Sequence, residues 1–257
     1  MGKYVDGFVV PINEASIEGY RKLSEAASRK HIELGALGYL EAVGDDLDSE
    51  YTASFKRVAG IGDEETVTFA YVVYDSKDDR DRVNAAIMED EETTAMMEAA
   101  GNVFDPTRMA FGGFRTIVEA REEFTGMEEK NGMGKYVDGF VLPLKKEKVE
   151  AYQRMSEKAS HIWLEHGALE YVETVGDDLD SEHTASFREM AGASDDETVV
   201  FAYVVYASKE DRDRANAAIM EDERIKEMME GEEHPFDPKR MAYGGFRSIV
   251  EAYKEQG

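Results

Sequence analysis

The spacing of apolar residues changes several times along the first 125 positions, and each change marks the boundary of a predicted element. Stretches in which apolar and polar residues alternate, rich in aromatic and β-branched side chains, predict strands. Stretches in which apolar residues recur every three or four positions predict helices, and Ser76 with Asp79 three residues later is typical of a helix N-terminus. The predicted elements are, in order, a strand over 4–12, a helix from 17 to the glycine at 35, strands over 39–43 and 66–74, a helix over 77–88, a weaker helical stretch around Met96 and Met97, and a strand over 108–118.

This order of strands and helices predicts a ferredoxin-like βαββαβ unit of the α+β class. Such a unit is a four-stranded antiparallel sheet with both helices on one face. The other face has no helix over it, and a monomer rarely leaves so large an apolar surface in contact with water. A second sheet packed against that face would bury it.

The second half of the chain repeats the first. Residues 1–125 align with 133–257 at a constant offset of 132 without a gap, and MGKYVDGFVVP, for example, recurs as MGKYVDGFVLP. We therefore expect two units, 1–125 and 133–257, joined by a linker at 126–132, where the sequence GMEEKNG is charged and flanked by glycine. The two sheets should pack face to face as an intramolecular dimeric α+β barrel, so that the chain is a pseudo-dimer and either a monomer or a weak homo-oligomer.

Several segments of this chain resemble the YbaA-like family, which is known as domain of unknown function 1428 and belongs to the dimeric α+β barrel superfamily. In the second unit these segments are YVDGFVLP, IWLEHGALEYVETVGDD, DETVVFAYVVYASKEDRDRANAAIM and PFDPKRMAYGGFRSIV. The resemblance covers nearly all of each unit. It implies a ferredoxin-like unit paired across its sheet, as in homodimers of single-unit members, and it implies no particular activity.

The two units differ at positions that are distinctive of this pattern. The aligned pairs are Trp163 with His31, His166 with Leu34, and Pro235 with Val103. If the tryptophan and the histidine belong to a site, only the second unit carries it fully. Drift in one half of the fused chain explains the same differences equally well.

Asp6 and Asp138 lie in the middle of predicted strands, on the same side as their aromatic neighbours. A carboxylate on so apolar a face must be paired, hydrogen-bonded or protonated. Arg115 and Arg247 are the nearest expected cations, because the first and last strands of this fold are neighbours. Each pair is either a polar anchor in the barrel cavity, where the carboxylate orients a ligand or acts as a general base, or a structural ion pair at the edge of the sheet.

His166 follows Trp163 by three residues, so both side chains lie on one helix face and could line an aromatic pocket. His166 could act there as a general base or metal ligand, although a histidine before a glycine more often caps the end of its helix. Asp138 and His166 are thus the two candidate catalytic residues. No second histidine stands at ligand spacing, so we expect no metal site and no cofactor.

Further repeated polar residues are expected to have structural roles. The loop 45–50, repeated at 177–182, is rich in carboxylates but lacks the glycine and the distal glutamate of a calcium-binding EF-hand, which favours a solvated acidic turn. Arg80, Arg82 and Asn84, with Arg212, Arg214 and Asn216 in the second unit, lie among aspartates early on a helix, where pairing between neighbouring turns explains them better than anion binding. Paired glycines at 112–113 and 244–245 indicate a bulge or a close approach in the last strand.

The net charge of the chain excludes some classes of binding partner. The 257 residues include 56 Asp and Glu against 30 Lys and Arg, a formal net charge of −26. This excess excludes non-specific nucleic-acid binding and disfavours anionic membrane surfaces. Because the acids are spread over both units, we interpret them as a halophilic surface suited to high salt, with acidity for solubility alone as the alternative.

The cellular compartment is predicted only from the absence of targeting signals and of cysteine in the sequence. The chain has no cysteine, its first residues do not form the pattern of a signal peptide, and no window approaches 18 uninterrupted apolar residues. We therefore expect a cytoplasmic protein.

Three classes of function fit these patterns. We favour binding of a small molecule in the paired-barrel cavity. A cofactor-independent enzyme of the monooxygenase or isomerase type, which shares this architecture, is the alternative, and a structural or interaction module is the third. The candidate ligand-binding residues are Tyr4, Asp6, Tyr71, Arg115, Asp138, Trp163, His166, Tyr203 and Arg247.

Overall fold

The structure is a computed structural model that describes residues 2–49, 51–91, 93, 95, 103–121, 134–180, 184–230 and 234–254. The expected linker at 126–132 and the expected helical stretch around Met96 and Met97 lie outside these residues. All the strands and helices discussed below lie within them.

Each unit follows the predicted order, with one short strand and one short helix added. The first unit contains β1 (Tyr4–Asn13), α1 (Ile17–Leu34), β2 (Gly38–Asp46), β3 (Ala53–Ser54), α2 (Phe55–Val58), β4 (Glu65–Tyr74), α3 (Lys77–Glu89) and β5 (Ala110–Arg121). The second contains β6 (Tyr136–Lys145), α5 (Val149–Glu165), β7 (Glu170–Asp178), β8 (Ala185–Ser186), α6 (Phe187–Ala191), β9 (Glu197–Tyr206), α7 (Lys209–Glu221), α8 (Glu223–Glu230) and β10 (Ala242–Tyr253).

The helices begin and end at the residues from which their ends were predicted. The Ser76 side chain accepts a hydrogen bond from the backbone N–H of Asp79 and so caps the first turn of α3. At the end of α1, Gly35 has φ of 120° and donates its N–H to the carbonyls of His31 and Ile32. Only glycine adopts that φ without strain, so α1 stops there.

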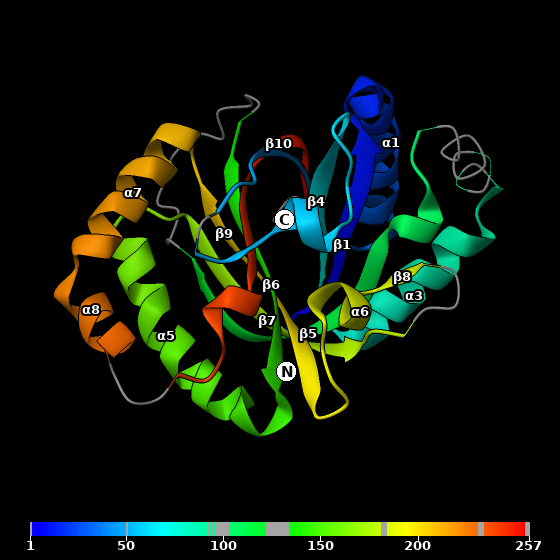
Figure 1. Cartoon of the computed structure of the whole chain (residues 1–257). Coiled ribbons are helices and arrows are strands. Elements are labelled where there is room, and N and C mark those ends of the chain that lie inside the picture. The colour runs from blue at the N-terminus through cyan, green and yellow to red at the C-terminus, as the bar shows by residue number, and fades with distance from the viewer. Residues whose placement is uncertain are drawn as a thin grey trace.

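The eight long strands close into one barrel that both units share (Figure 1). Hydrogen bonding follows the order β1-β4-β2-β10-β6-β9-β7-β5, and β5 pairs back with β1. Two of these pairings, β2 with β10 and β5 with β7, join the two units. The predicted fold is confirmed: two ferredoxin-like units form an intramolecular α+β barrel.

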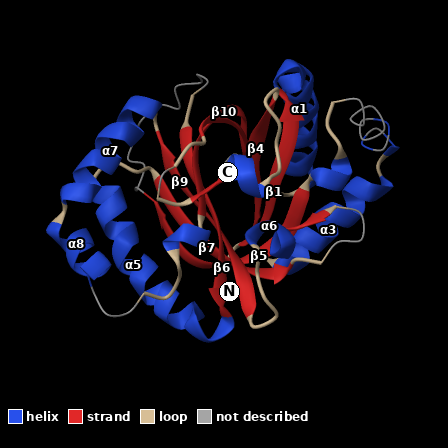
Figure 2. Ribbon diagram, viewed as in Figure 1, coloured by secondary structure: helices blue, strands red, loops and turns tan. Residues whose placement is uncertain are grey.

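Helices cover the outside of the barrel on two opposite sides, α1 and α3 on one side and α5, α7 and α8 on the other (Figure 2). Helix α1 packs over β2 and β10, and α5 packs over β7 and β5. Each long helix therefore crosses a junction between the units. Alternation along the strands explains the division, because Val5 and Val9 face the barrel interior whereas Tyr4 and Phe8 face the helices.

Aromatic rings fill the middle of the barrel. Phe69 stacks on Phe201 with ring centroids 4.5 Å apart, and Tyr71 stacks on Tyr203 at 3.8 Å. All four side chains are buried. The rings leave no room for a side chain on the facing strand, because a Cβ atom at Gly7 would lie 3.0 Å from the ring of Phe201.

The two ends of the barrel differ. The stacked rings are separated by the repeat offset of 132 residues, so β4 and β9 run in the same direction and the pseudo-twofold axis follows the barrel axis. At one end, Phe55 of α2 and Phe187 of α6 pack edge-on against the stacked phenylalanines. We call the opposite end, beyond Tyr71 and Tyr203, the tyrosine end.

Candidate functional site

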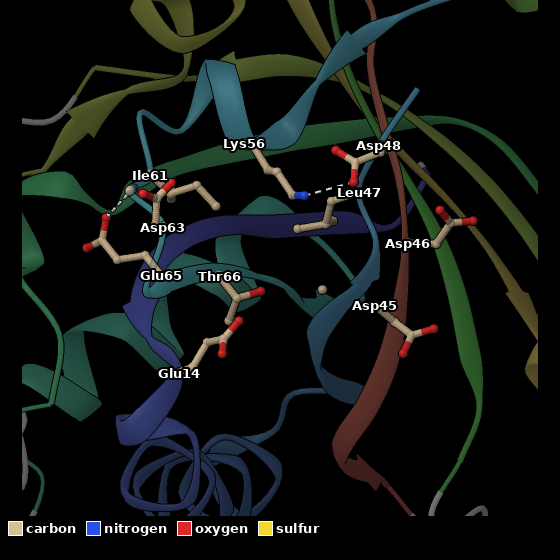
Figure 3. A pocket seen from close by; sticks show the side chains of 12 residues that line it. Glu14, Asp45, Asp46, Leu47, Asp48, Lys56, Ile61, Asp63, Glu65 and Thr66 are labelled. Carbon is tan, nitrogen blue, oxygen red and sulfur yellow. Dashed lines mark hydrogen bonds and ion pairs between the residues drawn. The ribbon is translucent and has the colours of Figure 1, made fainter. Parts of the chain in front are cut away.

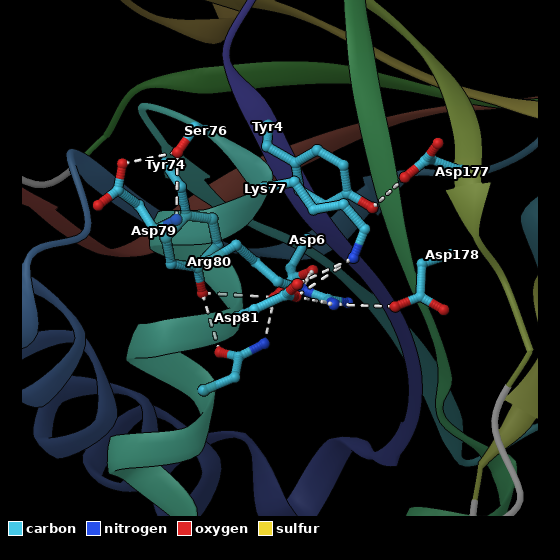
Figure 4. Close-up of polar contacts among 11 residues, drawn as sticks. Tyr4, Asp6, Tyr74, Ser76, Lys77, Asp79, Arg80, Asp81, Asp177 and Asp178 are labelled. Atoms are coloured by element: carbon cyan, nitrogen blue, oxygen red, sulfur yellow. Dashed lines mark hydrogen bonds and ion pairs between the residues drawn. The ribbon is translucent and has the colours of Figure 1, made fainter.

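Asp6 makes a buried ion pair, but with a different cation from the one predicted (Figure 4). Its side chain is 1% exposed and accepts hydrogen bonds from Arg80 Nε at 2.7 Å and from Asn84 Nδ2 at 2.9 Å. Both donors lie on α3, one turn apart, and point onto the outer face of β1. Tyr74 Oη lies 3.3 Å from the same carboxylate.

The prediction that Arg115 and Arg247 pair with the strand aspartates is wrong, and the strand register gives the reason. β1 and β5 are neighbours as expected, but Arg115 stands opposite Tyr4, whereas Asp6 stands opposite Gly113. A Cβ atom at Gly113 would lie 2.6 Å from the Tyr4 hydroxyl and 2.9 Å from Arg80, so the glycine makes room for the arginine that replaces the expected partner.

The same network ties the two units together. Arg80 also donates from Nη1 to Asp178 of the second unit at 2.9 Å, and the Tyr4 hydroxyl donates to Asp177 at 3.0 Å (Figure 4). Burial raises the pKa of Asp6, and the Arg80 guanidinium opposes this shift. The carboxylate and its arginine thus form a cross-unit lock rather than an anchor inside the cavity.

The second unit repeats this lock with one additional hydrogen bond. Arg212 donates from Nε to Asp138 at 2.8 Å and from Nη1 to Asp46 of the first unit at 3.0 Å. Its Nη2 also donates to the hydroxyl of Tyr243 at 2.8 Å, where the first unit has Phe111. The arginines that the sequence suggested were helix-surface pairs are therefore the main partners of the buried aspartates.

His166 lies at the end of α5 and bonds to Asp222, between α7 and α8. Its Nε2 lies 3.0 Å from Asp222 Oδ2, and Trp163 packs against the ring of Tyr171 at 5.8 Å between centroids. Asp138 instead takes its partners from α7 and β10. The two candidate catalytic residues therefore have no partner in common among the described residues.

The nine candidate ligand-binding residues do not line one cavity, so that part of the prediction is wrong. Alternation along the strands separates them: Tyr71 and Tyr203 lie inside the barrel, whereas Tyr4, Asp6 and Asp138 lie on its outer face under the helices. Arg115 and Arg247 are exposed, the side chain of Arg247 to 59%, and Trp163 and His166 lie on α5.

Two buried glutamates, Glu41 and Glu173, were not predicted from the sequence. Glu41, on β2, is 2% exposed and accepts hydrogen bonds from Tyr20 of α1 at 2.6 Å and from Tyr39 at 3.1 Å. Glu173 repeats the arrangement on β7 with Tyr152 and Tyr171. Burial raises the pKa of both carboxyls to about 7, although the tyrosine hydroxyls oppose the shift. An acid inside the apolar runs YLEAV and YVETV was the available signal.

A cleft of about 380 Å³ opens beside the Asp45–Asp48 loop, and carboxylates dominate its wall (Figure 3). Its lining residues are Glu14, Gly44, Asp45, Asp46, Leu47, Asp48, Lys56, Ile61, Gly62, Asp63, Glu65 and Thr66. Lys56 is the single basic residue among them and lies 2.9 Å from Asp48. We call this space the acidic cleft.

The first-unit cleft differs from the equivalent surface of the second unit. Lys146 stands where the first unit has Glu14, and its Nζ donates to the backbone carbonyl of Asp195 at 2.9 Å. Asp195 corresponds to Asp63 of the acidic cleft. In the second unit a lysine therefore replaces an acidic residue of the first-unit cleft, and it is hydrogen-bonded to the opposite wall of the equivalent surface.

The described part of the chain offers no ready-made metal centre. No group of three or more His, Cys, Asp or Glu side chains there has the geometry to hold a metal ion. No helix in the same residues is long and apolar enough to cross a membrane.

Solved structures of other proteins share this fold over the whole chain. A proposed monooxygenase from Fusobacterium nucleatum is similar with a TM-score of 0.61 at 10% sequence identity, and the match covers 100% of this chain and 96% of that one. A proposed monooxygenase from Lactobacillus acidophilus is similar with a TM-score of 0.60 at 14% identity, covering 99% and 97%. At these identities the similarity shows the α+β barrel fold alone.

Relatives with higher sequence identity match this chain over about the length of one unit. The protein "Uncharacterized protein YbaA" of Escherichia coli strain K12 is 46% identical over 117 residues, which are 46% of this chain and 98% of the relative; the Shigella flexneri protein matches equally. The relative therefore corresponds to one unit. The family model described as "Protein of unknown function (DUF1428)" matches twice, at residues 3–106 and 135–238. The chain belongs to this family and carries two copies of its domain.

Proposed function

We propose that the protein binds a small organic cation in the acidic cleft of the first unit. The observation that carries this proposal is the composition of the cleft wall, which is lined by six acidic residues and one lysine. A volume of about 380 Å³ is within the range of small-molecule sites. Clustered charge of one sign in a concave surface concentrates ligands of the opposite sign.

The partners of the wall carboxylates support a preformed site. Arg108 and the N–H of Gly62 hold Glu65 and lower its pKa to about 2, so it stays ionised. Arg212 and Lys209 bind Asp46 and Asp45 from the second unit. The rigid part of the wall therefore depends on the barrel being closed, whereas the exposed Glu14 makes no ion pair with any described residue.

This proposal keeps the hypothesis that the protein binds a small molecule, but it places the binding site outside the barrel interior. The middle of the barrel is occupied by the four stacked rings described above, so the proposed site lies instead in the acidic cleft, a space of about 380 Å³.

Calorimetric titration with di- and triamines at constant ionic strength tests the proposal. We expect putrescine or spermidine to bind the wild-type protein, while acetate and phosphate do not. Glu14→Lys copies the residue of the second unit, reverses one wall charge and should weaken binding about tenfold or more. The matched control is Lys146→Glu, which changes the equivalent position outside the cleft and should leave the first-site affinity unchanged. Equal affinities for wild type and Glu14→Lys would refute the proposal.

A cofactor-independent oxygenase is a second proposal, favoured by Glu41 and Glu173. A carboxyl with a pKa of about 7 is suited to general base catalysis near neutral pH. Solved relatives by fold include proposed monooxygenases and an anthrone oxidase-like protein, the latter with a TM-score of 0.55 at 13% identity. Oxygen consumption with anthrone that disappears in both Glu41→Gln and Glu173→Gln would support this activity. No consumption above the protein-free rate would contradict it.

We also propose that the chain works as a cytoplasmic monomer. The barrel closes within one chain, so no second chain is needed to bury the sheet faces. Light scattering of the purified protein should give the mass of one chain.

A further inference from the structure

A second, smaller space lies at the tyrosine end of the barrel, on the side opposite Phe55 and Phe187. It measures about 30 Å³ and is lined by Lys3, Leu37, Gly38, Tyr71, Val73, Arg121, Glu170 and Tyr253. Residues of both units contribute to it. A space of this size exceeds the ~10–15 Å³ that one water molecule needs and is close to the volume of two.

Two buried polar atoms at this space have no hydrogen-bond partner among the described residues. One is the hydroxyl of Tyr71, whose residue is 2% exposed, and the other is Glu170 Oε1. Glu170 Oε1 lies 2.8 Å from Arg121 Nη2 in an ion pair, but the N–H is not directed well enough to form a hydrogen bond. A buried polar group without a partner is unfavourable, so both atoms favour an occupant.

The charges around the space determine the class of this occupant. The surrounding cations are Lys3, Lys135 and Arg121, and the surrounding anions are Glu119, Glu170 and Glu251, which bind one another in the ion pairs Lys3–Glu119, Lys135–Glu251, Arg121–Glu119 and Arg121–Glu170. Three positive charges match three negative ones. The place therefore suits a neutral molecule that both donates and accepts hydrogen bonds.

Equivalent positions of the two units line this space from both sides of the pseudo-twofold axis, but with different residues. Glu170 corresponds to Gly38 and Arg121 corresponds to Tyr253. On the Gly38 side the Tyr253 ring lies against the backbone, since a Cβ atom at Gly38 would be 3.3 Å from it. On the other side, the acid and the arginine leave a polar wall. The polar wall is therefore formed by the Glu170 and Arg121 side of this space.

We propose that the tyrosine end of the barrel is a binding site for a single small, neutral, protic molecule of one or two non-hydrogen atoms, bonded to the Tyr71 hydroxyl and Glu170. Its occupant is either resident water or a small solute such as hydroxylamine. Both have the same chemistry, because each donates to the carboxylate and bonds the phenol oxygen.

A crystal structure of the wild-type protein at high resolution tests occupancy directly. We expect density for one or two atoms within hydrogen-bond distance of Tyr71 Oη and Glu170 Oε1. Empty space there, or a Tyr71 hydroxyl bonded to another protein group, overturns the proposal. This measurement does not depend on whether any variant folds.

Thermal melting of Tyr71→Phe gives an independent answer. If an occupant is bound, loss of the hydroxyl removes one of its partners and lowers the melting temperature. If the space is empty, the same change removes an unpaired buried polar group, and a rise in melting temperature contradicts the proposal.

The double variant Arg121→Tyr/Glu170→Gly is the matched control, because it copies the arrangement that already exists at Tyr253 and Gly38. It should fold and show no density at the site. Adding hydroxylamine at mildly alkaline pH, where it is neutral, separates the two occupants. A rise in the wild-type melting temperature that the double variant lacks identifies an exchangeable solute, and density without a rise identifies resident water. A double variant that keeps the same density and the same response overturns the role of Glu170.

Discussion

At the scale of single residues, four buried carboxyls in equivalent strands have different partners and therefore different chemistry. Asp6 and Asp138 each face an arginine, which favours the charged form. Glu41 and Glu173 are hydrogen-bonded by neutral tyrosine hydroxyls, so burial dominates and their pKa rises from the ordinary value of 4.5 to about 7. The two glutamates should therefore titrate near neutral pH.

Replacing both glutamates by glutamine should flatten the pH dependence of stability between about pH 5 and 8. With a folded pKa above the unfolded one, the native state binds more protons at these two groups in this window, so their contribution to stability is fully present below pH 4.5 and is lost as pH rises through 7. Each glutamate contributes about 3 kcal/mol of that fall. Urea unfolding of wild type and Glu41→Gln/Glu173→Gln across this range measures it, and parallel curves would contradict the prediction.

The sequence predicted the need of Asp6 for a partner but not the partner itself. Its position among Tyr4 and Phe8 showed that it lies on an apolar face. Which cation reaches it depends on the strand register, which places Gly113 opposite it, and on the docking of α3. Neither is encoded in the local pattern of β1. The glutamates were missed because one acid inside an apolar run looks like ordinary alternation.

At the scale of elements, α3 and α7 each hold the first strand of their own unit and contact the other unit. Each is capped by a serine at its start and directs an arginine and an asparagine, four residues apart, onto the first strand of its unit. The arginine reaches further, to the β7 or β2 end of the other unit. The two helices therefore fix the position of one unit against the other.

Removing one partner of this buried pair should be far more destabilising than removing both. Asp6→Ala leaves Arg80 buried without its main partner, which should lower the free energy of unfolding by about 3 kcal/mol. Asp6→Leu/Arg80→Met should lose less stability than Asp6→Ala alone, because no buried charge is left unpaired. Denaturant unfolding of the wild type and of both variants measures these losses.

The second unit provides the control for this prediction. Arg212 keeps the Tyr243 hydroxyl as a partner, so Asp138→Ala should be less destabilising than Asp6→Ala. Equal losses in the two units would show that this additional hydrogen bond contributes nothing.

Long elements were predictable because their periodicity is local, and β1, α1 and α3 begin within a residue of the expected positions. The two-residue strands β3 and β8 were not predictable. Ala53 pairs with Ala242 and Ala185 pairs with Ala110, so each depends on a strand of the other unit and has no periodicity of its own. The short helices α2 and α6 follow them directly and were missed for the same reason.

At the scale of the whole molecule, the sequence repeat predicted the barrel but not the side-chain packing in its interior. Period-two alternation showed which face of each strand is apolar. It did not show that Phe69 would meet Phe201 or that Tyr71 would meet Tyr203, because these contacts depend on how the two sheets face each other. A cavity was therefore expected where the rings stack.

The net charge of −26 predicts that salt stabilises the protein. Screening shortens to about 3 Å at 1 M salt, so repulsion among surface carboxylates should weaken and the melting temperature should rise between low salt and about 2 M KCl. Scanning calorimetry at increasing KCl measures this.

Choline chloride at equal ionic strength is the control for that prediction. An equal rise in both salts indicates screening, whereas a rise in KCl alone indicates bound potassium. A melting temperature that stays constant in both would contradict the interpretation of the acidic surface as halophilic.

The position of the pseudo-twofold axis along the barrel has an evolutionary consequence. In a homodimer of single units, every substitution near the axis appears twice and must be compatible with its own copy. A glutamate there would face a second glutamate across a few ångströms. Fusion of the two units removes this requirement, because the equivalent positions can then change independently. The fused chain has used this freedom: Glu170 and Arg121 form an ion pair on one side of the axis, whereas Gly38 and Tyr253 stand at the equivalent positions on the other.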